Sequence, residues 1–250
     1  MERILKTNKG EEKSPNEAVF PILTGNIKTK EFIFVATGFF INPYGGFITA
    51  KHVMFDDSEQ PINPFFAIQT VKGKTYLRRL EHFVYHPLAD IAIGMLSNDV
   101  IKKNKLIKVP IETIYFQLSK NAPNINDEIK TFAYPESTIK SDGKEQIGIF
   151  NGIWQNGIIE EFYPKGTGAF LKSPCYQTSV LIQGGASGGP VLHKGKVIGI
   201  NSTGYKQLKE EKPLSFITPI TEILEMSVIV GQNKRISVKE LIAQGKILFN

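Results

Sequence analysis

Short runs of Ile, Val, Phe and Tyr recur at close spacing along the chain and are broken by Gly, Pro, Asn and Asp. This alternation is typical of antiparallel β proteins, because their strands are short and turn residues separate them. It predicts strands in the first half at 18–25, 31–41, 46–50, 64–71, 75–85 and 90–96. In the second half it predicts strands at 127–135, 145–155, 157–163, 176–182, 189–193, 196–202 and 214–220. The pattern therefore indicates an all-β protein.

Turn and cap residues add detail to this pattern. Asp142-Gly143 lies between two apolar runs and is a two-residue hairpin signal. Helical spacing is found only near the end, at 218–226, where Pro219 suits a first turn, and at 237–243. Ser237, with Glu240 three residues later, forms a capping-box pattern.

Polar residues become frequent between 97 and 122, and no strong period holds there. We place the division between two β units in this stretch, which gives an N-terminal unit over 17–110 and a second unit over 123–221. A helical tail would follow over 222–250. Each unit is predicted to be a small barrel or sandwich, with a site between the two.

Composition narrows the class of protein. The chain has 250 residues, of which 41% are hydrophobic, so it can bury a large core. No apolar run approaches the roughly 18 residues that cross a bilayer, and the first 17 residues lack the apolar stretch of a secretory signal. Cys175 is the only cysteine, which excludes an intrachain disulfide and, with the missing signal, favours the cytoplasm.

The net charge of +6 does not indicate nucleic-acid binding, because the basic residues are scattered and no binding motif accompanies them. The densest group of lysines, at 102, 103, 105 and 108, is interpreted as a solvated loop. No Cys and His cluster has metal-ligand spacing, so we expect neither a metal nor an organic cofactor.

The stretch QGGASGGPVL at 183–192 places Ser187 between two pairs of glycines. Glycines allow unusual backbone angles and can turn N–H groups toward one point, so Ser187 is a candidate nucleophile. A Gly-rich hairpin is the alternative interpretation of these residues alone. A serine nucleophile needs a base, a carboxylate that orients the base, and donors for the developing oxyanion.

The chain has four histidines, at 52, 82, 86 and 193. His52 is the best candidate base, since it closes the apolar stretch GFITAKHVM at the end of a predicted strand. Asp90 opens the apolar run DIAIGML, where a carboxylate needs a hydrogen-bonding partner because uncompensated burial of charge is costly. His52, Asp90 and Ser187 all lie at strand boundaries, the first two in one half of the chain and the third in the other.

At these residues the sequence resembles the chymotrypsin-like (trypsin-like) serine peptidases, and among them the HtrA or Deg type. GFFINPYGGFITAKHV, DIAIGML and YQTSVLIQGGASGGPVL resemble the family's histidine, aspartate and nucleophile segments. KVIGINSTG and LSFITPI resemble the two strands that follow. The similarity spans about residues 33 to 221, and it implies two six-stranded antiparallel barrels with the active cleft between them, followed here by a short C-terminal helical segment.

The resemblance also implies roles for individual residues. His52 would be general base and then acid, Asp90 its orienting carboxylate and Ser187 the nucleophile. The N–H groups of Gly185 and Ser187 would form the oxyanion hole. Ser202 aligns with the serine that supports the aspartate.

The substrate site is implied in the same way. Substrate would pair as an added strand with the main chain of Ser202, Thr203 and Gly204. Leu181, Ile182 and Gln183 resemble one wall of the primary specificity pocket, and Phe216 resembles a residue that lines it. These pocket residues include no acid, so apolar or small residues are predicted before the scissile bond.

Two departures from the family pattern stand out. Ala186 occupies the position where digestive-type members have an aspartate that a newly cut N-terminus captures, and where HtrA-type members have an asparagine. HtrA-type proteins usually append a PDZ module, but only about thirty residues follow Ile220 here. The resemblance therefore implies a peptidase core that acts alone or under a regulatory protein partner.

The leading hypothesis is a cytoplasmic serine endopeptidase that cuts proteins or peptides through an acyl-enzyme. The alternative is a catalytically silent fold of the same type that binds proteins as a scaffold. A third interpretation makes the positive charge functional through an acidic partner or nucleic acid.

Overall fold

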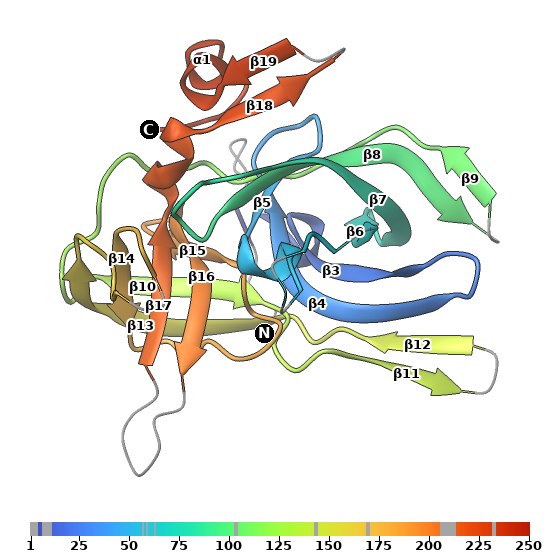
Figure 1. Ribbon diagram of the computed structural model, residues 1–250, viewed down its shortest axis with the longest axis horizontal. Helices are drawn as coiled ribbons and strands as arrows, with labels where there is room; N and C mark the ends of the chain where they lie inside the picture. Colours follow the sequence, from blue (N-terminus) through green and yellow to red (C-terminus); the bar gives the residue numbers. More distant parts are fainter. Residues whose placement is uncertain are drawn as a thin grey trace.

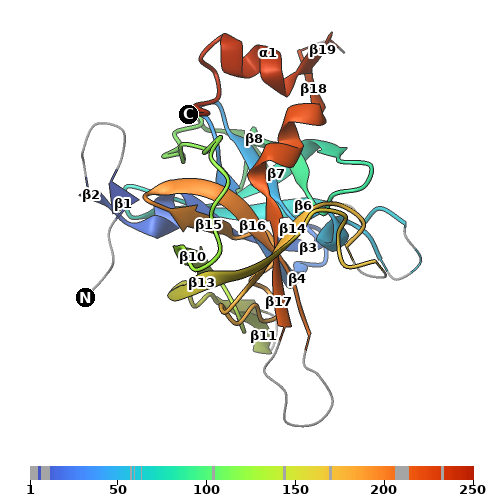
Figure 2. The ribbon, with the colours of Figure 1, turned by 90° about the vertical axis from the view of Figure 1, so that its left-hand side faces the viewer.

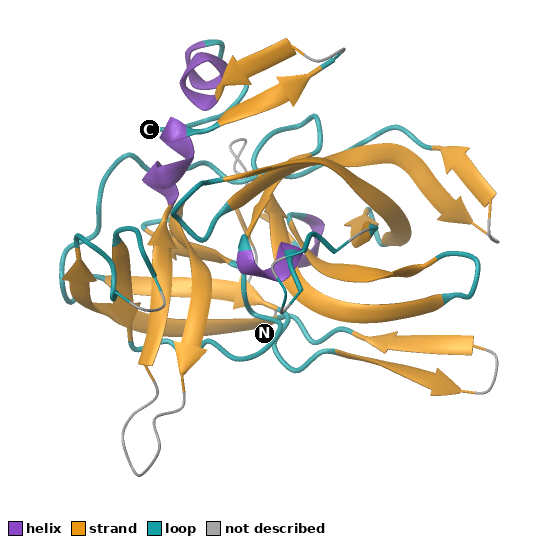
Figure 3. Cartoon of the chain, in the orientation of Figure 1, coloured by secondary structure: helices purple, strands orange, loops and turns teal. Residues whose placement is uncertain are grey.

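The computed structural model describes residues 5–6, 12–56, 58, 60–62, 64–102, 105–142, 145–168, 171–205, 214–231 and 234–250. Strands dominate it, and helices are few and short (Figure 3). The all-β prediction is confirmed. No helix in these ranges is both long enough and apolar enough to cross a membrane.

The first β unit is a sheet of antiparallel strands that closes on itself. Its order is β5-β4-β3-β6-β7-β8-β9, and a further pairing of β5 with β8 closes a six-stranded barrel, with β9 added outside the closure. The strands are β3 (Val19–Asn26), β4 (Glu31–Phe40), β5 (Gly46–Thr49), β6 (Phe65–Val71), β7 (Lys74–Tyr85), β8 (Ala92–Lys102) and β9 (Lys105–Lys108).

The second β unit is a closed barrel in the order β10-β13-β14-β17-β16-β15. Figure 1 shows it beside the first barrel, with a separate hairpin, β11–β12, extending below β3 and β4. The strands are β10 (Glu128–Ala133), β11 (Thr138–Asp142), β12 (Glu145–Ile149), β13 (Ile153–Tyr163), β14 (Cys175–Thr178), β15 (Pro190–His193), β16 (Lys196–Tyr205) and β17 (Leu214–Pro219). The expectation of two six-stranded antiparallel barrels is therefore confirmed.

Several boundaries differ from the sequence prediction. The predicted strand at 145–155 is two strands, β12 and β13, because the segment leaves one hairpin and enters the barrel. Lys102, Lys105 and Lys108 do not lie in a loop: β8 and β9 pair there, with Lys102 opposite Lys105, and the side chains of β9 are exposed, whereas Lys103 lies outside the described residues. The hairpin signal at Asp142-Gly143 is matched by the pairing of Asp142 with Glu145, although Gly143 lies outside the described residues.

The C-terminal segment is not wholly helical. It contains a hairpin of β18 (Ser227–Val230) and β19 (Lys234–Ser237), because the β-branched run in SVIV favours a strand. The helices are η3 (Ile220–Glu225) and α1 (Val238–Ala243), and Ser237 caps α1 by accepting a hydrogen bond from the Glu240 N–H at 3.1 Å. Figure 2 shows this segment above both barrels. Val238 and Leu241 are buried in the largest apolar cluster, so α1 packs on the barrels.

Short elements complete the chain. The N-terminal region contains the strand pair β1 (Leu5–Lys6) and β2 (Glu12–Lys13), followed by the 3-10 helix η1 (Pro15–Glu17). A second 3-10 helix, η2 (His52–Met54), follows β5. Phenylalanines fill the first barrel, where Phe20 packs against Phe40 and Phe47 with ring centroids 4.6 and 5.5 Å apart.

Arg78 is a charged residue in the interior of the first barrel. Its side chain is 1% exposed, and its guanidinium donates to the Gln69 Oε1 at 2.6 Å and to the carbonyl oxygens of Val109 and Pro110 at 2.9 and 3.0 Å. Burial lowers the pKa of Arg78. Since the acceptors are neutral oxygens, the side chain ties the connecting segment after β9 to β7 through hydrogen bonds.

We predict that Arg78→Met lowers the free energy of unfolding by roughly 3 kcal/mol, because buried oxygens lose their donors. Urea denaturation followed by fluorescence measures the change. Arg79→Ala is the matched control, because the side chain of Arg79 is 51% exposed, and it should change stability by at most about 0.5 kcal/mol. Equal stability of wild type and Arg78→Met would contradict this role.

Candidate active site

His52 and Asp90 meet because strands β5 and β8 pair. Thr49 lies opposite Ala92 in this pairing, so the residues just after β5 approach the turn just before β8. The His52 backbone N–H donates to Asp90 Oδ1 at 2.8 Å, and His52 Nδ1 lies 2.8 Å from Asp90 Oδ2. The carboxylate is thus held at both oxygens.

The two side chains differ in exposure and shift each other's pKa. The side chain of Asp90 is 11% exposed and that of His52 is 48% exposed. Burial raises the pKa of Asp90. The hydrogen bonds and charge of His52 and the hydrogen bond of the Ser202 hydroxyl lower it by more, so the pKa of Asp90 lies below its ordinary value. Burial lowers the pKa of His52, but the hydrogen bond and charge of Asp90 outweigh it and the net pKa is raised.

Ser202 brings the second barrel into this network. It lies on β16, is fully buried, and its hydroxyl donates to Asp90 Oδ2. His52, Asp90 and Ser202 therefore form one hydrogen-bonded group that crosses the interface between the barrels.

Ser187 lies in the second of two consecutive tight turns between β14 and β15. The Ala186 N–H donates to the Gln183 carbonyl, and the Gly189 N–H donates to the Ala186 carbonyl, both at 3.0 Å. The third residue of each turn is a glycine with positive φ, +87° at Gly185 and +82° at Gly188, as type II turns require. The glycines in QGGASGGPVL thus form these turns.

The Ser187 hydroxyl donates to the carbonyl oxygen of Ser202 at 3.1 Å. Within the described residues no hydrogen bond joins it to His52. Ser187 and Asp90 both bond Ser202, so the hydrogen bonds connect Ser187 to His52 only through Ser202 and Asp90.

The N–H groups of Gly185 and Ser187 donate no hydrogen bond within the described part of the chain. The carbonyls of the same two residues are hydrogen-bonded to Thr37. The Thr37 hydroxyl donates to the Gly185 carbonyl at 2.8 Å, and the Thr37 N–H donates to the Ser187 carbonyl at 3.0 Å. A Cβ on Gly185 would lie 2.3 Å from Phe34 Cε1, so only glycine fits there. Ala186 is buried in the core of the second barrel.

The segments predicted to bind substrate lie close together. Leu181 is exposed and Ile182 is buried, with its N–H donating to the Ser215 Oγ at 3.1 Å. A Cβ added to Gly204 would lie 2.2 Å from the Ile182 carbonyl oxygen, so the two walls of the predicted pocket approach each other there.

The other predicted pocket residues have clear partners. Phe216 is buried in a cluster with Leu171 and Cys175, and lies opposite Thr203 in the β16–β17 pairing. Gln183 Nε2 donates to Glu136 Oε1 at 2.6 Å.

The remaining histidines lie elsewhere. His82 is exposed on β7. His86 is buried, and its Nδ1 accepts the Ala89 N–H at 2.7 Å, which shapes the turn before Asp90. His193 Nδ1 lies 2.9 Å from the Glu128 carbonyl oxygen.

Thr37 is a site residue that was not predicted from the sequence, although the sequence carries a signal for it. Thr37 lies in the apolar strand EFIFVATGFF and is fully buried, and a buried hydroxyl requires hydrogen-bond partners. Those partners are in the second barrel, 97 and 148 residues further along the chain at Tyr134 and Gly185, so the sequence alone did not show them.

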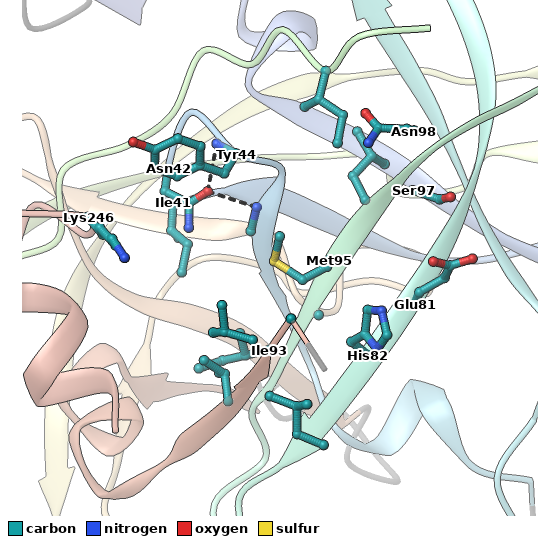
Figure 4. A pocket seen from close by; sticks show the side chains of 18 of the residues that line it. Ile41, Asn42, Tyr44, Glu81, His82, Ile93, Met95, Ser97, Asn98 and Lys246 are labelled. Atoms are coloured by element: carbon teal, nitrogen blue, oxygen red, sulfur yellow. Dashed lines mark hydrogen bonds between the residues drawn. The ribbon is translucent and has the colours of Figure 1, made fainter. Parts of the chain in front are cut away.

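A cavity of about 730 Å³ lies away from this group, between the first barrel and the C-terminal hairpin (Figure 4). Ile93 and Met95 line it from β8, and Val228 and Ile229 from β18. It shares no lining residue with the His52 group. Among the described residues, no three His, Cys, Asp or Glu side chains form a cluster that could hold a metal ion.

The two antiparallel barrels, with the His52 group across their interface, define the chymotrypsin-like fold class. The model of the trypsin-like peptidase domain matches residues 36–200. The chain therefore belongs to the trypsin-like peptidase family.

Individual relatives agree with this assignment. A serine protease DegP homolog from Plasmodium falciparum (isolate 3D7) is 31% identical over 145 residues, which cover 58% of this chain and 14% of that protein. The chain thus matches only a small part of that relative's length.

Solved structures share the fold at low identity. The active form of the Rv3671c protease from M. tuberculosis has a TM-score of 0.56 at 16% identity, covering 83% of this chain and 78% of that one. The MamO protease domain from Magnetospirillum magneticum has a TM-score of 0.57 at 15% identity, covering 82% and 92%.

The shifted pKa values of His52 and Asp90 make the stability of the folded protein depend on pH. The raised pKa of His52 contributes stability that is fully present below its ordinary value of 6.5 and is lost as the pH rises through the folded value. The lowered pKa of Asp90 contributes stability that is present above its ordinary value of 3.8 and is lost as the pH falls through the folded value.

We predict that Asp90→Asn lowers the pKa of His52 from above to below its ordinary value of 6.5, because burial then acts without the carboxylate. Titration of the imidazole by NMR measures this pKa in the wild type and the variant. Glu240→Gln, an exposed change on α1, serves as the control and should leave the titration unchanged. An unaltered His52 pKa in Asp90→Asn would contradict the pairing.

Proposed function

We propose that the protein is a serine endopeptidase in which Ser187 is the nucleophile, His52 the base and Asp90 the orienting carboxylate. The observation that carries the proposal is the two-point hold of Asp90 on His52, at the backbone N–H and at Nδ1, both at 2.8 Å. A carboxylate at Nδ1 favours the tautomer with its proton there, which leaves Nε2 free to accept a proton.

The proposed reaction follows from these positions. The Ser187 hydroxyl exchanges its present acceptor, the Ser202 carbonyl, for His52 Nε2 and attacks the substrate carbonyl carbon. The proton passes to Nε2 and then to the leaving amine, and water releases the acyl group in a second half-reaction. The unengaged N–H groups of Gly185 and Ser187 would stabilise the oxyanion.

The edge of β16 supports a peptide substrate. Pairing of β16 with β15 ends at Ile200, and from Thr203 to Tyr205 β16 pairs only with β17. An extended peptide can add to such an edge through main-chain hydrogen bonds. We therefore propose that Ser202, Thr203 and Gly204 bind substrate as a strand.

Reaction with a fluorophosphonate probe tests the nucleophile. We expect the wild type to be labelled, Ser187→Ala to be unlabelled, and Asp90→Asn to react about 10⁴-fold more slowly because the imidazole loses its orienting partner. Gel fluorescence and intact mass measure the labelling. Ser173→Ala, a change of a buried serine outside the site, is the control for nonspecific reaction. An unlabelled wild type would favour the silent scaffold over the peptidase.

The pocket walls support a preference for small residues. The Ile182 carbonyl lies against Gly204, and Phe216 is packed among Leu171 and Cys175, which leaves little width beside the scissile bond. The segment of the wall at 181–183 carries no acid that could pair with a basic side chain. We therefore propose small apolar residues before the scissile bond.

A peptide-library cleavage profile tests this preference, with Ser187→Ala as the inactive control. We expect cleavage after Ala, Val or Ser to exceed cleavage after Lys or Arg by at least tenfold, because an unpaired charge would have to be desolvated. Preferential cleavage after Lys, Arg or Phe would contradict the narrow pocket while leaving the nucleophile assignment intact.

A further inference from the structure

Each of the two proposed oxyanion donors, the N–H groups of Gly185 and Ser187, belongs to a peptide group whose carbonyl oxygen accepts a hydrogen bond from another segment. A peptide group is planar and trans, so its C=O and N–H point in opposite directions. The Gly185 N–H shares a peptide group with the Gly184 carbonyl, and the Ser187 N–H shares one with the Ala186 carbonyl. Fixing either carbonyl therefore fixes the direction of the N–H.

Asn201 holds the second of these groups together with the Gly189 N–H, which donates to the same Ala186 carbonyl at 3.0 Å. Its Nδ2 donates to the Ala186 carbonyl at 3.2 Å and to the Thr131 Oγ1 at 2.8 Å. Asn201 is 1% exposed, and its backbone is bonded to the same loop: its N–H donates to the Gly189 carbonyl at 2.9 Å, and its carbonyl accepts the Gly188 N–H at 2.8 Å. The amide is thus fixed in place by the strand beneath the turn.

Glu136 holds the first group. Its backbone N–H donates to the Gly184 carbonyl at 3.1 Å, and its carboxylate accepts from Gln183 Nε2 at 2.6 Å. Glu136 has a φ of +55°, a conformation that a non-glycine residue adopts at a cost. The residue therefore contacts the turn twice from the segment that leads into the β11–β12 hairpin.

Stability alone does not account for Asn201. Its Oδ1 is buried and has no hydrogen-bond partner among the described residues, which is unfavourable. A leucine of similar shape would leave no such atom. The amide nitrogen Nδ2, in contrast, donates a hydrogen bond to the Ala186 carbonyl.

We infer that Asn201 and the Glu136 backbone are positioning groups that keep the N–H groups of Gly185 and Ser187 directed at the substrate oxygen. They take the place of the ion pair that an aspartate at position 186 would form with a newly cut N-terminus. Ala186 cannot form it, because it has no polar side chain. This inference rests on the proposed function, because it concerns the oxyanion hole of that reaction.

Kinetics of Asn201→Leu test the inference with a fluorogenic peptide chosen from the cleavage profile. We expect kcat to fall about 10- to 100-fold, less than or equal to the loss of one oxyanion donor, with KM within about threefold. The melting temperature should change little, because the Ala186 carbonyl and Thr131 Oγ1 lose a donor while the unpartnered Oδ1 is removed. Thr131→Val is the matched control, since it removes the other acceptor of Nδ2 and keeps the bond to Ala186, and kcat should change less than about twofold.

An unchanged kcat in Asn201→Leu would overturn the role of Asn201. Equal losses in Asn201→Leu and Thr131→Val would also overturn it, because they would indicate general disturbance of the core. If Asn201→Leu does not fold, Asn201→Ala replaces it, with the same expected loss of kcat.

The Glu136 backbone is tested by Glu136→Pro, which removes the N–H and also the positive φ of +55°, because proline fixes φ at about −65°. We expect a loss of kcat similar to that of Asn201→Leu, with Glu136→Gly, which keeps the N–H and accepts positive φ, at least tenfold more active than the proline variant. Equal activity of the proline and glycine variants would remove Glu136 from the inference.

Crystal structures of the wild type and Asn201→Leu separate this inference from the proposed function. Rotation of the Ala186–Ser187 peptide group in the variant supports the positioning role, and an unrotated group overturns it. This result does not depend on turnover. A wild type that neither reacts with the fluorophosphonate nor cuts peptides would defeat the peptidase proposal, while the structures would still decide how the turn is held.

Discussion

The carboxylate of Asp90 is the group on which the site depends. It is nearly buried, and a buried charge is tolerated only where hydrogen bonds compensate it. His52 supplies two of those bonds and Ser202 a third. Because Ser202 belongs to β16 of the second barrel, compensation of this one charge requires both barrels to be folded and docked.

Thr37 supplies the second link between the barrels. Its buried hydroxyl, like the carboxylate of Asp90, requires hydrogen-bond partners. The carbonyls of Gly185 and Ser187 accept hydrogen bonds from its hydroxyl and its N–H, while its own hydroxyl accepts the Tyr134 N–H at 3.1 Å. A threonine at the centre of an apolar strand thereby fixes the Ser187 turn of the other barrel. Asp90 and Thr37 together give the interface polar contacts at His52 and at Ser187, the proposed base and nucleophile, where errors of position would matter most for that reaction.

Much of this arrangement could be predicted from the sequence. Period-two apolar runs and turn residues gave the strands, and the capping pattern at Ser237 gave the start of α1. The resemblance paired His52 with Asp90, and in the structure His52 Nδ1 lies 2.8 Å from Asp90 Oδ2. The contacts made by Thr37, Glu136 and Asn201 could not be predicted, because each depends on a partner distant in sequence and on the register of paired strands. The β18–β19 hairpin was missed because a short β-branched run carries little periodicity.

Ala186 shows why a single departure from a motif is a poor guide to the state of a site. Considered alone, the missing polar side chain suggests that the loop carrying Ser187 has less support. In the fold, Ala186 is buried among apolar residues, where a charged side chain would need a hydrogen-bonding partner to offset its burial. Support for the turn comes instead from main-chain carbonyls bound by Thr37, Asn201 and Glu136, which lie on three different segments. A turn held through its carbonyls needs no ionised group, so its geometry is coupled to the packing of the barrels rather than to the charge of one residue.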